Sequence, residues 1–348
     1  MVNFAIVGCG RVSGKHISSL KQIPKAKIVA VCDTKESRAI EVAKDCQCKC
    51  YFDYDEMLRN PEIEVVNICA PTGMHAEMTV KAAKADKHIV CEKPIALTMK
   101  DATEMIKACK ENNVKLFIVK QNRYNPPIMH LKKAIEVGRF GKIYIANTTI
   151  RWSRNQQYYD QDEWRGTILQ DGGVLMNQTA HHTDMLRWLV GDVESVFCKK
   201  DTFAHKIETE DSAVAVLKFK NGAIGTYEGT TCTFPKDLKG SISVLGERGS
   251  VEIGGFAMNK MDIWQFSETL PEDAEIVHTI TNPPNVYGYG HLPLLQEVVE
   301  CIHKGVPEKI SGDDAKETLR LIVAMLKSAK ENKEVRLDEI SNEDDNYY

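Results

Sequence analysis

The sequence predicts an α/β protein with two domains: a doubly wound parallel sheet at the N-terminus, followed by an α+β domain with an open-faced, mainly antiparallel sheet. Its length of 348 residues is more than one hydrophobic core usually organises. Short apolar runs alternate with amphipathic segments over residues 1–122, which is typical of strand–helix repeats. Over residues 123–348 the strand-like segments are longer and alternate apolar with polar residues, which indicates a sheet with one less covered face.

Strands of the first domain are expected where short apolar runs end in polar or turn-forming residues. These runs are apolar throughout, so helices are expected to cover both faces of the sheet. The amphipathic segments 37–46 and 101–113 predict two of those helices. The expected strands are residues 3–8, 27–33, 65–71, 87–93 and 115–121.

The second domain is expected to combine a sheet with helices at 172–190, 291–304 and 312–332. Its open sheet would expose an apolar face, which predicts a homo-oligomer, either a dimer or a tetramer. The closing residues 341–348 are polar and are expected to be frayed or bound to a partner. The expected strands are residues 142–152, 213–220, 223–231 and 241–253.

Composition and charge argue against several classes of protein. The net charge of −4 gives no electrostatic reason to expect nucleic acid or an acidic membrane surface as a partner. No apolar run approaches the roughly 18 residues of a membrane-spanning helix. Met1 leads straight into an expected strand, which leaves no room for a signal peptide. Eleven cysteines, several of them inside expected strands, suit the reducing cytoplasm.

Two strings of possible metal ligands do not predict a metal site. Cys46, Cys48 and Cys50 lack the second pair of ligands that zinc sites usually have. His181 and His182 are adjacent and would diverge by about 100° on a helix, so one ion is not expected to bind both. We therefore expect no metal, we do not favour a metal hydrolase, and His182 is expected to be a core contact.

A glycine-rich turn after the first strand predicts a dinucleotide site. Gly8 and Gly10 come at the end of residues 3–8, with Ser13 at the third small position and a helix-like segment after it. The two glycines allow a tight turn and the close approach of a pyrophosphate to the N-terminus of the helix. Asp33 ends the second strand, where a carboxylate accepts hydrogen bonds from a ribose 2′-hydroxyl and repels a 2′-phosphate. This pattern favours NAD over NADP as the cofactor.

Several motifs occur in a fixed order along the chain: GCGRVSGKH, NICAPTGMHAE, KHIVCEKPIAL, KQNRYNP, DEWRG and DGGVLMNQTAHHTDMLRWL. In that order and spacing, the chain resembles the Gfo/Idh/MocA oxidoreductases over essentially its whole length. The resemblance implies an N-terminal Rossmann domain and a C-terminal α/β domain whose open sheet commonly makes subunit contacts. It also implies NAD(P)-dependent oxidation or reduction of a sugar-type secondary alcohol.

Within that family, the motifs VKQNRYNPP, RWSRNQQYYDQDEWRGT and DGGVLMNQ are most similar to nucleotide-sugar 3-dehydrogenases. This resemblance implies oxidation of the C3 hydroxyl of a UDP-N-acetylhexosaminuronic acid, such as UDP-N-acetylglucosaminuronic acid, on the way to sugars of bacterial surface polysaccharides such as lipopolysaccharide O-antigen. Some relatives keep the dinucleotide bound and reoxidise it with 2-oxoglutarate, which is therefore a candidate co-substrate. One alternative is another sugar or polyol dehydrogenase of the family, of the inositol or glucose type. Another is a non-catalytic ligand-sensing regulator, although such regulators usually lack the lysine or histidine that stands here as Lys93 or His181.

The apolar residues 89–91 end in Glu92, Lys93 and Pro94, at the carboxyl end of an expected strand. Ligands of doubly wound sheets bind at this edge. As an ammonium, Lys93 would polarise a substrate hydroxyl, and as a neutral amine it would accept the proton itself. The resemblance implies a cis peptide bond between Lys93 and Pro94. Glu92 is expected to orient the ribose or to hold Lys93.

Asn177 and His181 are four residues apart, so on one helix both would point into the same cleft. The resemblance implies that His181 is the general base, which leaves the proton acceptor open between His181 and Lys93. Asp184 is expected to orient an imidazole or to serve the packing of its helix. Many relatives carry Asp where this chain has Asn177, and we expect the neutral residue to remove repulsion against a carboxylate on the substrate.

Cationic and aromatic residues complete the expected site. Arginine suits bidentate contact with a diphosphate or a carboxylate, so Arg123 is expected at the substrate. The resemblance places Trp164 and Arg165 near the cofactor, and His75 is expected either to contact the cofactor or to cap a helix. The residues expected to bind the substrate are Lys93, Arg123, Tyr158, Asn177 and His181. The residues expected to bind NAD are Gly8, Gly10, Arg11, Val12, Asp33, Ala70, Pro71, Thr72, His75, Glu92, Lys93, Pro94, Gln121, Trp164 and Arg165.

Overall fold

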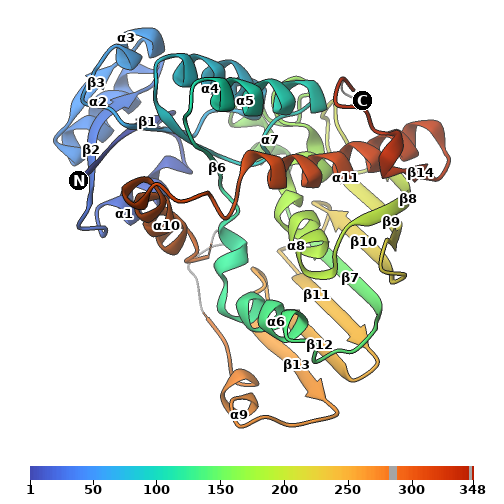
Figure 1. The fold of residues 1–348 in the computed structure, drawn as a ribbon. Coiled ribbons are helices and arrows are strands. Elements are labelled where there is room, and N and C mark those ends of the chain that lie inside the picture. Colours follow the sequence, from blue (N-terminus) through green and yellow to red (C-terminus); the bar gives the residue numbers. More distant parts are fainter. Residues whose placement is uncertain (282–287, 345–346) are drawn as a thin grey trace. The chain divides into compact units, whose positions relative to one another are not determined.

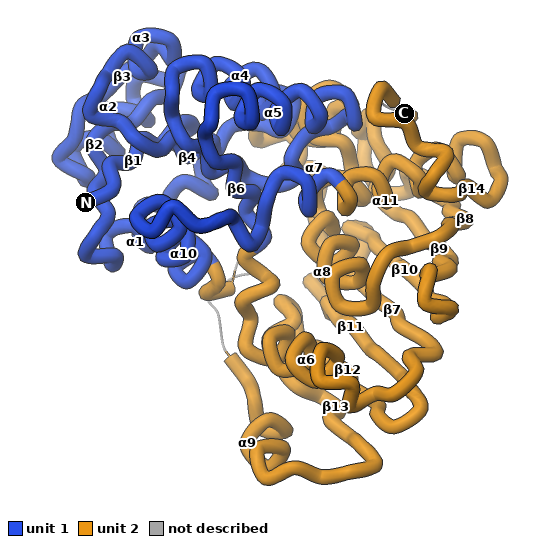
Figure 2. Tube along the Cα trace, in the orientation of Figure 1, with its two compact units in different colours: residues 1–120, 291–316 blue, residues 121–290, 317–348 orange. Residues whose placement is uncertain are grey.

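The computed structural model describes residues 1–281, 288–344 and 347–348 (Figure 1). The chain folds into two compact units (Figure 2). Unit 1 contains Met1–Lys120 and His291–Lys316, and unit 2 contains Gln121–Gly290 and Glu317–Tyr348. The segment 291–316, which the sequence analysis placed in the second domain, therefore packs with the first.

Unit 1 is built on a six-stranded sheet in the order β3-β2-β1-β4-β5-β6. Every strand pair in it is parallel, which confirms the predicted doubly wound sheet. Side chains such as Phe4, Ile6 and Val66 are fully buried, as expected for strands covered on both faces. The strand order reverses between β1 and β4, and ligands of such sheets bind at the carboxyl ends of the strands at this point. The strands are β1 (Val2–Val7), β2 (Ala26–Cys32), β3 (Lys49–Tyr51), β4 (Val65–Ile68), β5 (His88–Cys91) and β6 (Leu116–Ile118).

Helices pack around this sheet in unit 1. They are α1 (Ser13–Leu20), α2 (Glu36–Cys46), α3 (Tyr54–Leu58), η1 (Thr72–Met74), α4 (His75–Lys84), α5 (Met99–Glu111) and α10 (His291–Lys304). Helix α10 contacts α1 and β1 and belongs to unit 1 (Figure 2). It buries Leu294, Leu295 and Val298. Its amphipathic spacing predicted a helix with one buried face, and the structure shows that this face covers the sheet of unit 1.

Unit 2 is built on an eight-stranded sheet in the order β13-β12-β11-β7-β10-β9-β8-β14 (Figure 1). Strands β7 and β10 pair in parallel and the other neighbours pair antiparallel, which confirms the mainly antiparallel sheet. The strands are β7 (Ile143–Arg151), β8 (Val193–Asp201), β9 (Ser212–Phe219), β10 (Ile224–Thr230), β11 (Lys239–Gly246), β12 (Gly249–Gly254), β13 (Lys260–Phe266) and β14 (Val335–Arg336). The strand register puts several exposed apolar side chains on one face, which we call the open face: Phe197, Val214, Val216, Ile224, Leu245 and Ile263.

The helices of unit 2 include one break that the sequence did not predict. They are η2 (Gln121–Tyr124), α6 (Pro126–Glu136), α7 (Gln156–Asp160), η3 (Val174–Gln178), α8 (Ala180–Val190), α9 (Asp273–Ile276), α11 (Gly312–Glu331, which begins in unit 1) and η4 (Leu337–Glu339). The expected single helix at 172–190 is wrong, because η3 is a turn of π-helix. The backbone N–H of Thr179 donates to the carbonyl oxygen of Val174, five residues back, and its hydroxyl donates to the same oxygen.

The end of the chain packs onto unit 2. The hydroxyl of Tyr348 donates to the carbonyl oxygen of Gly172, and Nζ of Lys200 lies 4.1 Å from the centre of the Tyr348 ring. The expectation of a frayed tail is therefore wrong for Tyr348, while residues 345–346 lie outside the described part of the chain. Among the helices that the structure describes, none is both long and apolar enough to cross a membrane.

Candidate active site

The turn between β1 and α1 leaves room for a pyrophosphate. Gly8 has a φ of +84°, and a Cβ there would lie 2.7 Å from the carbonyl oxygen of Cys69, so only glycine is accommodated. A Cβ on Gly10 would meet no heavy atom within 4 Å, so the backbone is open at this point. Arg11 and Val12 complete the turn before α1 begins. Backbone N–H groups at the N-terminus of α1 would meet a phosphate here, and these residues therefore fit a dinucleotide.

Asp33 follows β2, beside this turn. Its Oδ2 accepts a hydrogen bond from the backbone N–H of Cys9 at 2.7 Å, and its Oδ1 accepts one from the N–H of Lys35 at 2.7 Å. These bonds fix the carboxylate at the edge of the sheet. Asp33 is only partly buried, so its remaining lone pairs can accept hydrogen bonds from a ribose.

Asp33→Asn is expected to weaken NADH binding about tenfold, because a neutral amide replaces a charged hydrogen-bond acceptor. The ratio of the affinities for NADH and NADPH should also fall, because the charge that repels a 2′-phosphate is removed. Fluorescence titration with both dinucleotides measures the two effects. Asp55→Asn, on the exposed surface of α3, is the control. Equal NADH affinity of the wild-type protein and Asp33→Asn would contradict the role of Asp33.

The turn after β5 contains a cis peptide bond between Lys93 and Pro94, as expected. His75, at the start of α4, lies buried against this turn. Its Nδ1 is 2.9 Å from the carbonyl oxygen of Pro94, and its Nε2 is 3.0 Å from that of Ala70. Burial lowers the pKa of His75, so the neutral ring donates to one of these oxygens at a time. His75 therefore links the loops that follow β4 and β5. The first of these loops contains the predicted residues Ala70, Pro71 and Thr72.

Glu92 is buried beneath the same turn. Its Oε1 lies 2.9 Å from Nε2 of His16 and 3.7 Å from Nε2 of His291. Its Oε2 accepts a hydrogen bond from the backbone N–H of Lys93 at 3.2 Å. Burial raises the pKa of Glu92, but the two histidines outweigh burial and hold that pKa well below its usual value. Of the two roles expected for Glu92, the geometry favours holding Lys93.

His181 and Asn177 come from consecutive helical turns of unit 2. His181 is the second residue of α8, and its Nε2 lies 3.0 Å from Nε2 of Gln121, a residue that the sequence analysis expected at the cofactor. Asn177 lies in η3, and its Nδ2 donates a very short hydrogen bond to Oδ1 of Asp171. Because the π-turn separates Asn177 from His181, the two do not share one face of an α-helix, and that part of the prediction is wrong.

Asp171 is a candidate site residue that the sequence analysis missed. It is buried, and its Oδ2 accepts a hydrogen bond from the backbone N–H of Gly166 at 2.7 Å. It places a carboxylate directly beside Asn177, so the surroundings of Asn177 are not free of negative charge. The signal in the sequence is the pair Gly172-Gly173 after Asp171, since both glycines have a positive φ, of 81° and 77°.

Arg123 and Asp184 form a buried ion pair in unit 2. Nε and Nη2 of Arg123 each lie 2.7 Å from a carboxylate oxygen of Asp184, and the hydroxyl of Thr318 donates to Asp184 at 2.7 Å. Arg123 and Asp184 are 4% and 2% exposed. This geometry favours a structural role for Arg123 over the predicted contact with a substrate anion. It also gives Asp184 the packing role that was one of its two expected roles.

Tyr158, Trp164 and Arg165, all predicted site residues, lie together in unit 2. Nη1 of Arg165 donates to the hydroxyl of Tyr158 at 2.7 Å, and its guanidinium lies 4.5 Å from the ring centres of both Tyr158 and Trp164. Nε2 of Gln178 donates to the same hydroxyl at 3.0 Å, which connects the group to η3. A guanidinium held between aromatic rings is suited to bind an anion or to stack on a base.

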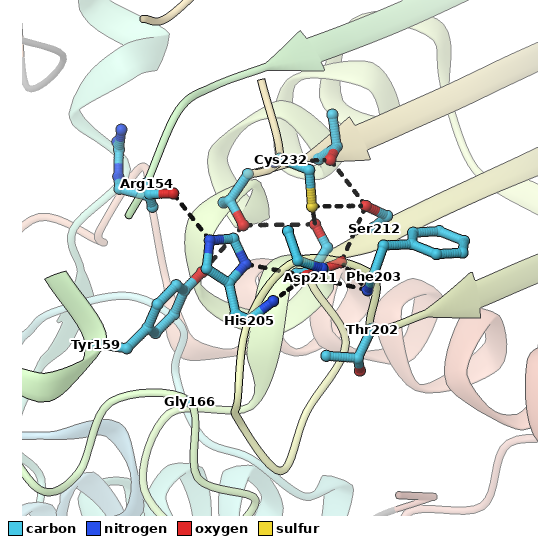
Figure 3. A network of polar contacts seen from close by, with 12 residues as sticks. Arg154, Tyr159, Gly166, Thr202, Phe203, His205, Asp211, Ser212 and Cys232 are labelled. Atoms are coloured by element: carbon cyan, nitrogen blue, oxygen red, sulfur yellow. Dashed lines mark hydrogen bonds and ion pairs between the residues drawn. The ribbon is translucent and has the colours of Figure 1, made fainter. Parts of the chain in front are cut away.

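A polar network anchors the segment that carries this group (Figure 3). Nδ1 of His205 lies 2.9 Å from Oδ2 of Asp211, and its Nε2 lies 2.8 Å from the carbonyl oxygen of Arg154. Asp211 also accepts hydrogen bonds from the backbone N–H groups of Phe203 and Ala204. Burial raises the pKa of Asp211, but these backbone bonds outweigh burial and lower it. Because Arg154 lies just before α7, the network fixes the start of the segment with Tyr158.

Possible metal ligands gather in two places among the described residues. Each place brings three ligand atoms within 4.8 Å of one another: His16, Glu92 and His291 in unit 1, and His205, Asp211 and Cys232 in unit 2. Neither group includes the cysteine or histidine strings that the sequence analysis considered. His182 lies instead in the core of unit 2, with its ring centre 5.2 Å from that of Trp152, as expected.

Two family models match the chain. The first, an oxidoreductase family with an NAD-binding Rossmann fold, matches residues 2–120, and the second, the C-terminal α/β domain of the same family, matches residues 132–337. The chain belongs to the Gfo/Idh/MocA oxidoreductase family. Its N-terminal domain is therefore an NAD-binding Rossmann domain, and the open turn at Gly8 and Gly10 agrees with that cofactor.

Several characterised proteins are similar to this Gfo/Idh/MocA chain. The WlbA dehydrogenase from Bordetella pertussis, solved with NADH and UDP-GlcNAcA, is 37% identical with a TM-score of 0.91, over 96% of this chain and 97% of that chain. The WlbA dehydrogenase from Chromobacterium violaceum, solved with the same two ligands, is 36% identical with a TM-score of 0.91, over 96% of this chain and 95% of that chain. The myo-inositol 2-dehydrogenase of Thermotoga maritima is 30% identical over 97% of this chain and 99% of that protein.

The candidate site residues of this Gfo/Idh/MocA protein are distributed over both units. Unit 1 offers the NAD turn and the side chain of Lys93 at the carboxyl edge of its sheet. Unit 2 offers the imidazole of His181, the pair Asn177 and Asp171, and the guanidinium of Arg165. The first is a turn that fits a dinucleotide, and the others are side chains that can carry a proton, donate a hydrogen bond or bind an anion.

Proposed function

We propose that this protein oxidises the C3 hydroxyl of a UDP-N-acetylhexosaminuronic acid to a ketone, with NAD as the cofactor. The observation that carries the proposal is the similarity to two WlbA dehydrogenases bound to UDP-GlcNAcA, at 36% and 37% identity with TM-scores of 0.91. The product is a 3-keto sugar for bacterial surface polysaccharides. We place the reaction in the cytoplasm, because the eleven cysteines are all free thiols and suit a reducing compartment.

Oxidation of a secondary alcohol requires one group that polarises the hydroxyl and one that accepts its proton. We assign the first role to the ammonium of Lys93 and the second to the imidazole of His181. NAD, when bound, would accept the hydride, which is the hydrogen of the alcohol carbon together with two electrons. The amide of Gln121 faces Nε2 of His181, and with its oxygen turned toward this nitrogen it keeps a proton there. Nδ1 then presents the lone pair that accepts the hydroxyl proton.

The cationic group of Arg165 with Tyr158 and Trp164 is the candidate for holding the diphosphate or the uronate carboxylate. Arg123 is a weaker candidate, because both its Nε and its Nη2 donate to the buried carboxylate of Asp184 at 2.7 Å. Arg165 also has an acidic partner, Asp162, but that carboxylate is more exposed and lies 3.1 Å from Nε of Arg165. Asn177 offers an amide that can hydrogen-bond a sugar hydroxyl. Its neutrality is offset by the neighbouring carboxylate of Asp171, so it does not by itself explain a preference for an acidic sugar.

The test is a substrate screen on the purified protein, followed by the absorbance of NADH. UDP-N-acetylglucosaminuronic acid is expected to support NADH formation, and UDP-N-acetylglucosamine, glucose and myo-inositol are expected to support little. If the protein retains NADH between cycles, adding the UDP-sugar acid together with 2-oxoglutarate should give continuous turnover. Turnover with myo-inositol and none with the UDP-sugar acid would contradict the proposal.

A polyol dehydrogenase is the second candidate function. The 30% identity to the myo-inositol 2-dehydrogenase, over 97% of this chain, favours it. The same screen separates the two candidates, because myo-inositol carries no anionic group for Arg165 to bind. A non-catalytic regulator would bind NAD and form no NADH with any of these compounds.

We also propose that the protein is a homo-oligomer, a dimer or a tetramer, which associates through the open face of unit 2. The face presents apolar side chains from five strands, among them Val214 and Val216, each 56% exposed. Exposed apolar side chains that gather on one face of a sheet often mark a site of protein association. Strand β9 is flanked by β10 and β8 and is not an edge strand, so its exposed valines would lie inside a contact between copies.

The double variant Val214→Glu/Val216→Glu is expected to weaken this association at least about a hundredfold, because it would bury two carboxylates without partners. Size-exclusion chromatography with light scattering at micromolar concentration should then show a monomer. The control is Val137→Glu/Val277→Glu, which changes two exposed valines of unit 2 that lie outside its sheet. An unchanged mass for the Val214→Glu/Val216→Glu variant would exclude the open face as the interface.

A further inference from the structure

Three side chains from separate parts of unit 1 meet in its interior. His16 lies in α1, Glu92 follows β5 and His291 begins α10, and all three are buried. Oε1 of Glu92 lies between the two rings, 2.9 Å from Nε2 of His16 and 3.7 Å from Nε2 of His291. The rings meet edge to face, with their centres 5.4 Å apart. A buried carboxylate is strongly destabilising unless a positive charge pairs with it, so one of these rings has to supply that charge.

His16 is the ring that carries the charge. Burial lowers the pKa of His16, but its contacts with Cys69 and Glu92 outweigh burial and raise that pKa from 6.5 to about 10. Burial also lowers the pKa of His291, and this effect is larger than the opposite effect of Glu92. The ring of His291 therefore stays neutral at neutral pH. The cluster therefore holds one carboxylate and one imidazolium, and its net charge is zero.

The hydrogen bonds at the second nitrogen of His16 agree with a cationic ring. Nδ1 of His16 lies 2.9 Å from Nδ2 of Asn67, while Oδ1 of Asn67 is buried without a hydrogen-bond partner among the described residues. The oxygen and nitrogen of a side-chain amide exchange places when the amide turns by half a revolution. That turn brings Oδ1 to Nδ1, where it accepts the second N–H of an imidazolium. Oδ1 of Asn67 and the second N–H of the His16 ring are then partners.

The second oxygen of Glu92 reaches the turn that carries Lys93. Oε2 accepts the backbone N–H of Lys93 at 3.2 Å, and His75 contacts the carbonyl oxygen of Pro94 on the next residue. We propose that His16 and Glu92 are positioning residues for Lys93: the buried imidazolium of His16 keeps the Glu92 carboxylate charged, and this carboxylate fixes the turn that presents Lys93. The inference rests on the proposed dehydrogenase function and adds His16 and Glu92 to it as positioning residues.

The titratable groups around this pair come from every element packed against it. Burial raises the pKa of the Cys91 thiol, which stays neutral. Burial also raises the pKa of the Cys69 thiol, while the neighbouring His16 lowers it. His75 is neutral as well, for the same reason of burial. Lys15 in α1 is a further charged group, and it lowers the pKa of His291. The two histidines hold the pKa of Glu92 well below its usual value. The charge of Glu92 is therefore expected to persist throughout the range near neutral pH.

The direct test follows the histidine rings of the full-length protein by 15N NMR between about pH 5 and pH 9. One ring, assigned by its loss in His16→Gln, is expected to remain an imidazolium up to about pH 8 in the wild-type protein. In Glu92→Gln the same ring should turn neutral below about pH 7, because burial then acts without the carboxylate. A His16 ring that is neutral at about pH 7 in the wild-type protein overturns the proposal. This measurement needs no substrate, so a failure of the proposed function would be recognised separately.

Kinetics test the effect on Lys93. His16→Gln is expected to lower kcat about ten- to a hundredfold and to change the dissociation constant of NADH less than about twofold, because a displaced lysine affects turnover more than binding. Its kcat should fall further as the pH drops from about 7 to 5, since the Glu92 carboxyl protonates more readily without His16. Glu92→Asp keeps the charge and should recover part of the kcat lost in Glu92→Gln.

His88→Gln is the matched control. His88 begins β5, at the end of the strand opposite the turn of Lys93, and its Nδ1 accepts a hydrogen bond from the backbone N–H of Lys115 at 3.0 Å. Thermal melting shows which variants are folded. If His16→Gln does not fold, the comparison of kcat between Glu92→Gln and Glu92→Asp tests the proposal instead. A folded His16→Gln or Glu92→Gln variant with wild-type kcat and pH profile would refute the positioning role.

Discussion

Replacing Lys93 with glutamine is expected to lower kcat about a thousandfold. Glutamine keeps a hydrogen-bond donor, but it carries no charge to polarise the substrate hydroxyl. The turn is held by His75 and Glu92 through backbone atoms, so the substitution removes the ammonium and leaves the turn in place. The dissociation constant of NADH should change less than about threefold, because Gly8, Gly10 and Asp33 hold the dinucleotide. Steady-state NADH formation with the UDP-sugar acid measures kcat, and fluorescence titration measures binding.

Lys93→Arg and His181→Asn separate the two candidate proton acceptors. Arginine keeps the positive charge but does not release its proton near neutral pH. If Lys93 only polarises the hydroxyl, Lys93→Arg should keep a measurable part of kcat, and His181→Asn should lose the pH dependence near neutrality. If Lys93 is the acceptor, Lys93→Arg should be as inactive as Lys93→Gln. Lys100→Gln, on the exposed start of α5, is the control and should leave kcat unchanged.

The parts of the site that the sequence predicts are those that neighbouring residues determine. Gly8 is required by a positive φ and by the closeness of the Cys69 carbonyl, and its place directly after an apolar run already indicates such a turn. Asp33 ends a strand of a parallel sheet, and this alone puts its carboxylate at the edge where ligands bind. Lys93 and Pro94 are placed by the same argument.

Partners that lie far apart in the sequence cannot be predicted from local patterns. Glu92 and His16 are separated by 76 residues, and Arg123 and Asp184 by 61, so each pair is visible only in the folded unit. Because local patterns do not reveal that Asp184 is its partner, Arg123 is predicted from the sequence to be a cation that can bind a substrate. The same limit applies to α10, because amphipathic spacing predicts a buried face but does not tell which sheet the face covers.

The π-turn at η3 escapes prediction for a different reason. Val174, Leu175 and Met176 before Asn177 are apolar and buried, and so are Met185 and Leu186 after it, so one extra residue in a turn does not interrupt the apolar pattern of a helix. The turn is decided by the positive φ of Gly173 and by the hydrogen bond from Thr179 to Val174. A spacing of four residues therefore does not place Asn177 and His181 on one α-helical face. The close neighbour of Asn177 is Asp171 instead.

Asp184→Ala is expected to lower the free energy of unfolding by about 3–5 kcal/mol. The variant leaves the guanidinium of Arg123 buried at 4% exposure without its carboxylate. It also removes the acceptor of the Thr318 hydroxyl. Arg123→Met/Asp184→Leu removes both charges and should recover most of the loss, because apolar side chains of similar volume can replace a buried ion pair. Urea unfolding followed by tryptophan fluorescence measures both variants, since Trp188 lies 4.9 Å from the guanidinium.

An exposed ion pair provides the control for this prediction, and the double variant separates stability from binding. Glu194 lies 3.0 Å from Arg336, but their side chains are 38% and 52% exposed, so Glu194→Ala should change the free energy of unfolding by less than about 1 kcal/mol. An equally small effect of Asp184→Ala would mean that the buried pair is no stronger than the exposed one.

If Arg123 binds a substrate anion, KM for the UDP-sugar acid should rise at least about tenfold in the folded Arg123→Met/Asp184→Leu variant. If its role is structural, as its contacts with Asp184 indicate, KM should stay within about twofold of the wild-type value, and Arg165 becomes the cation to test next.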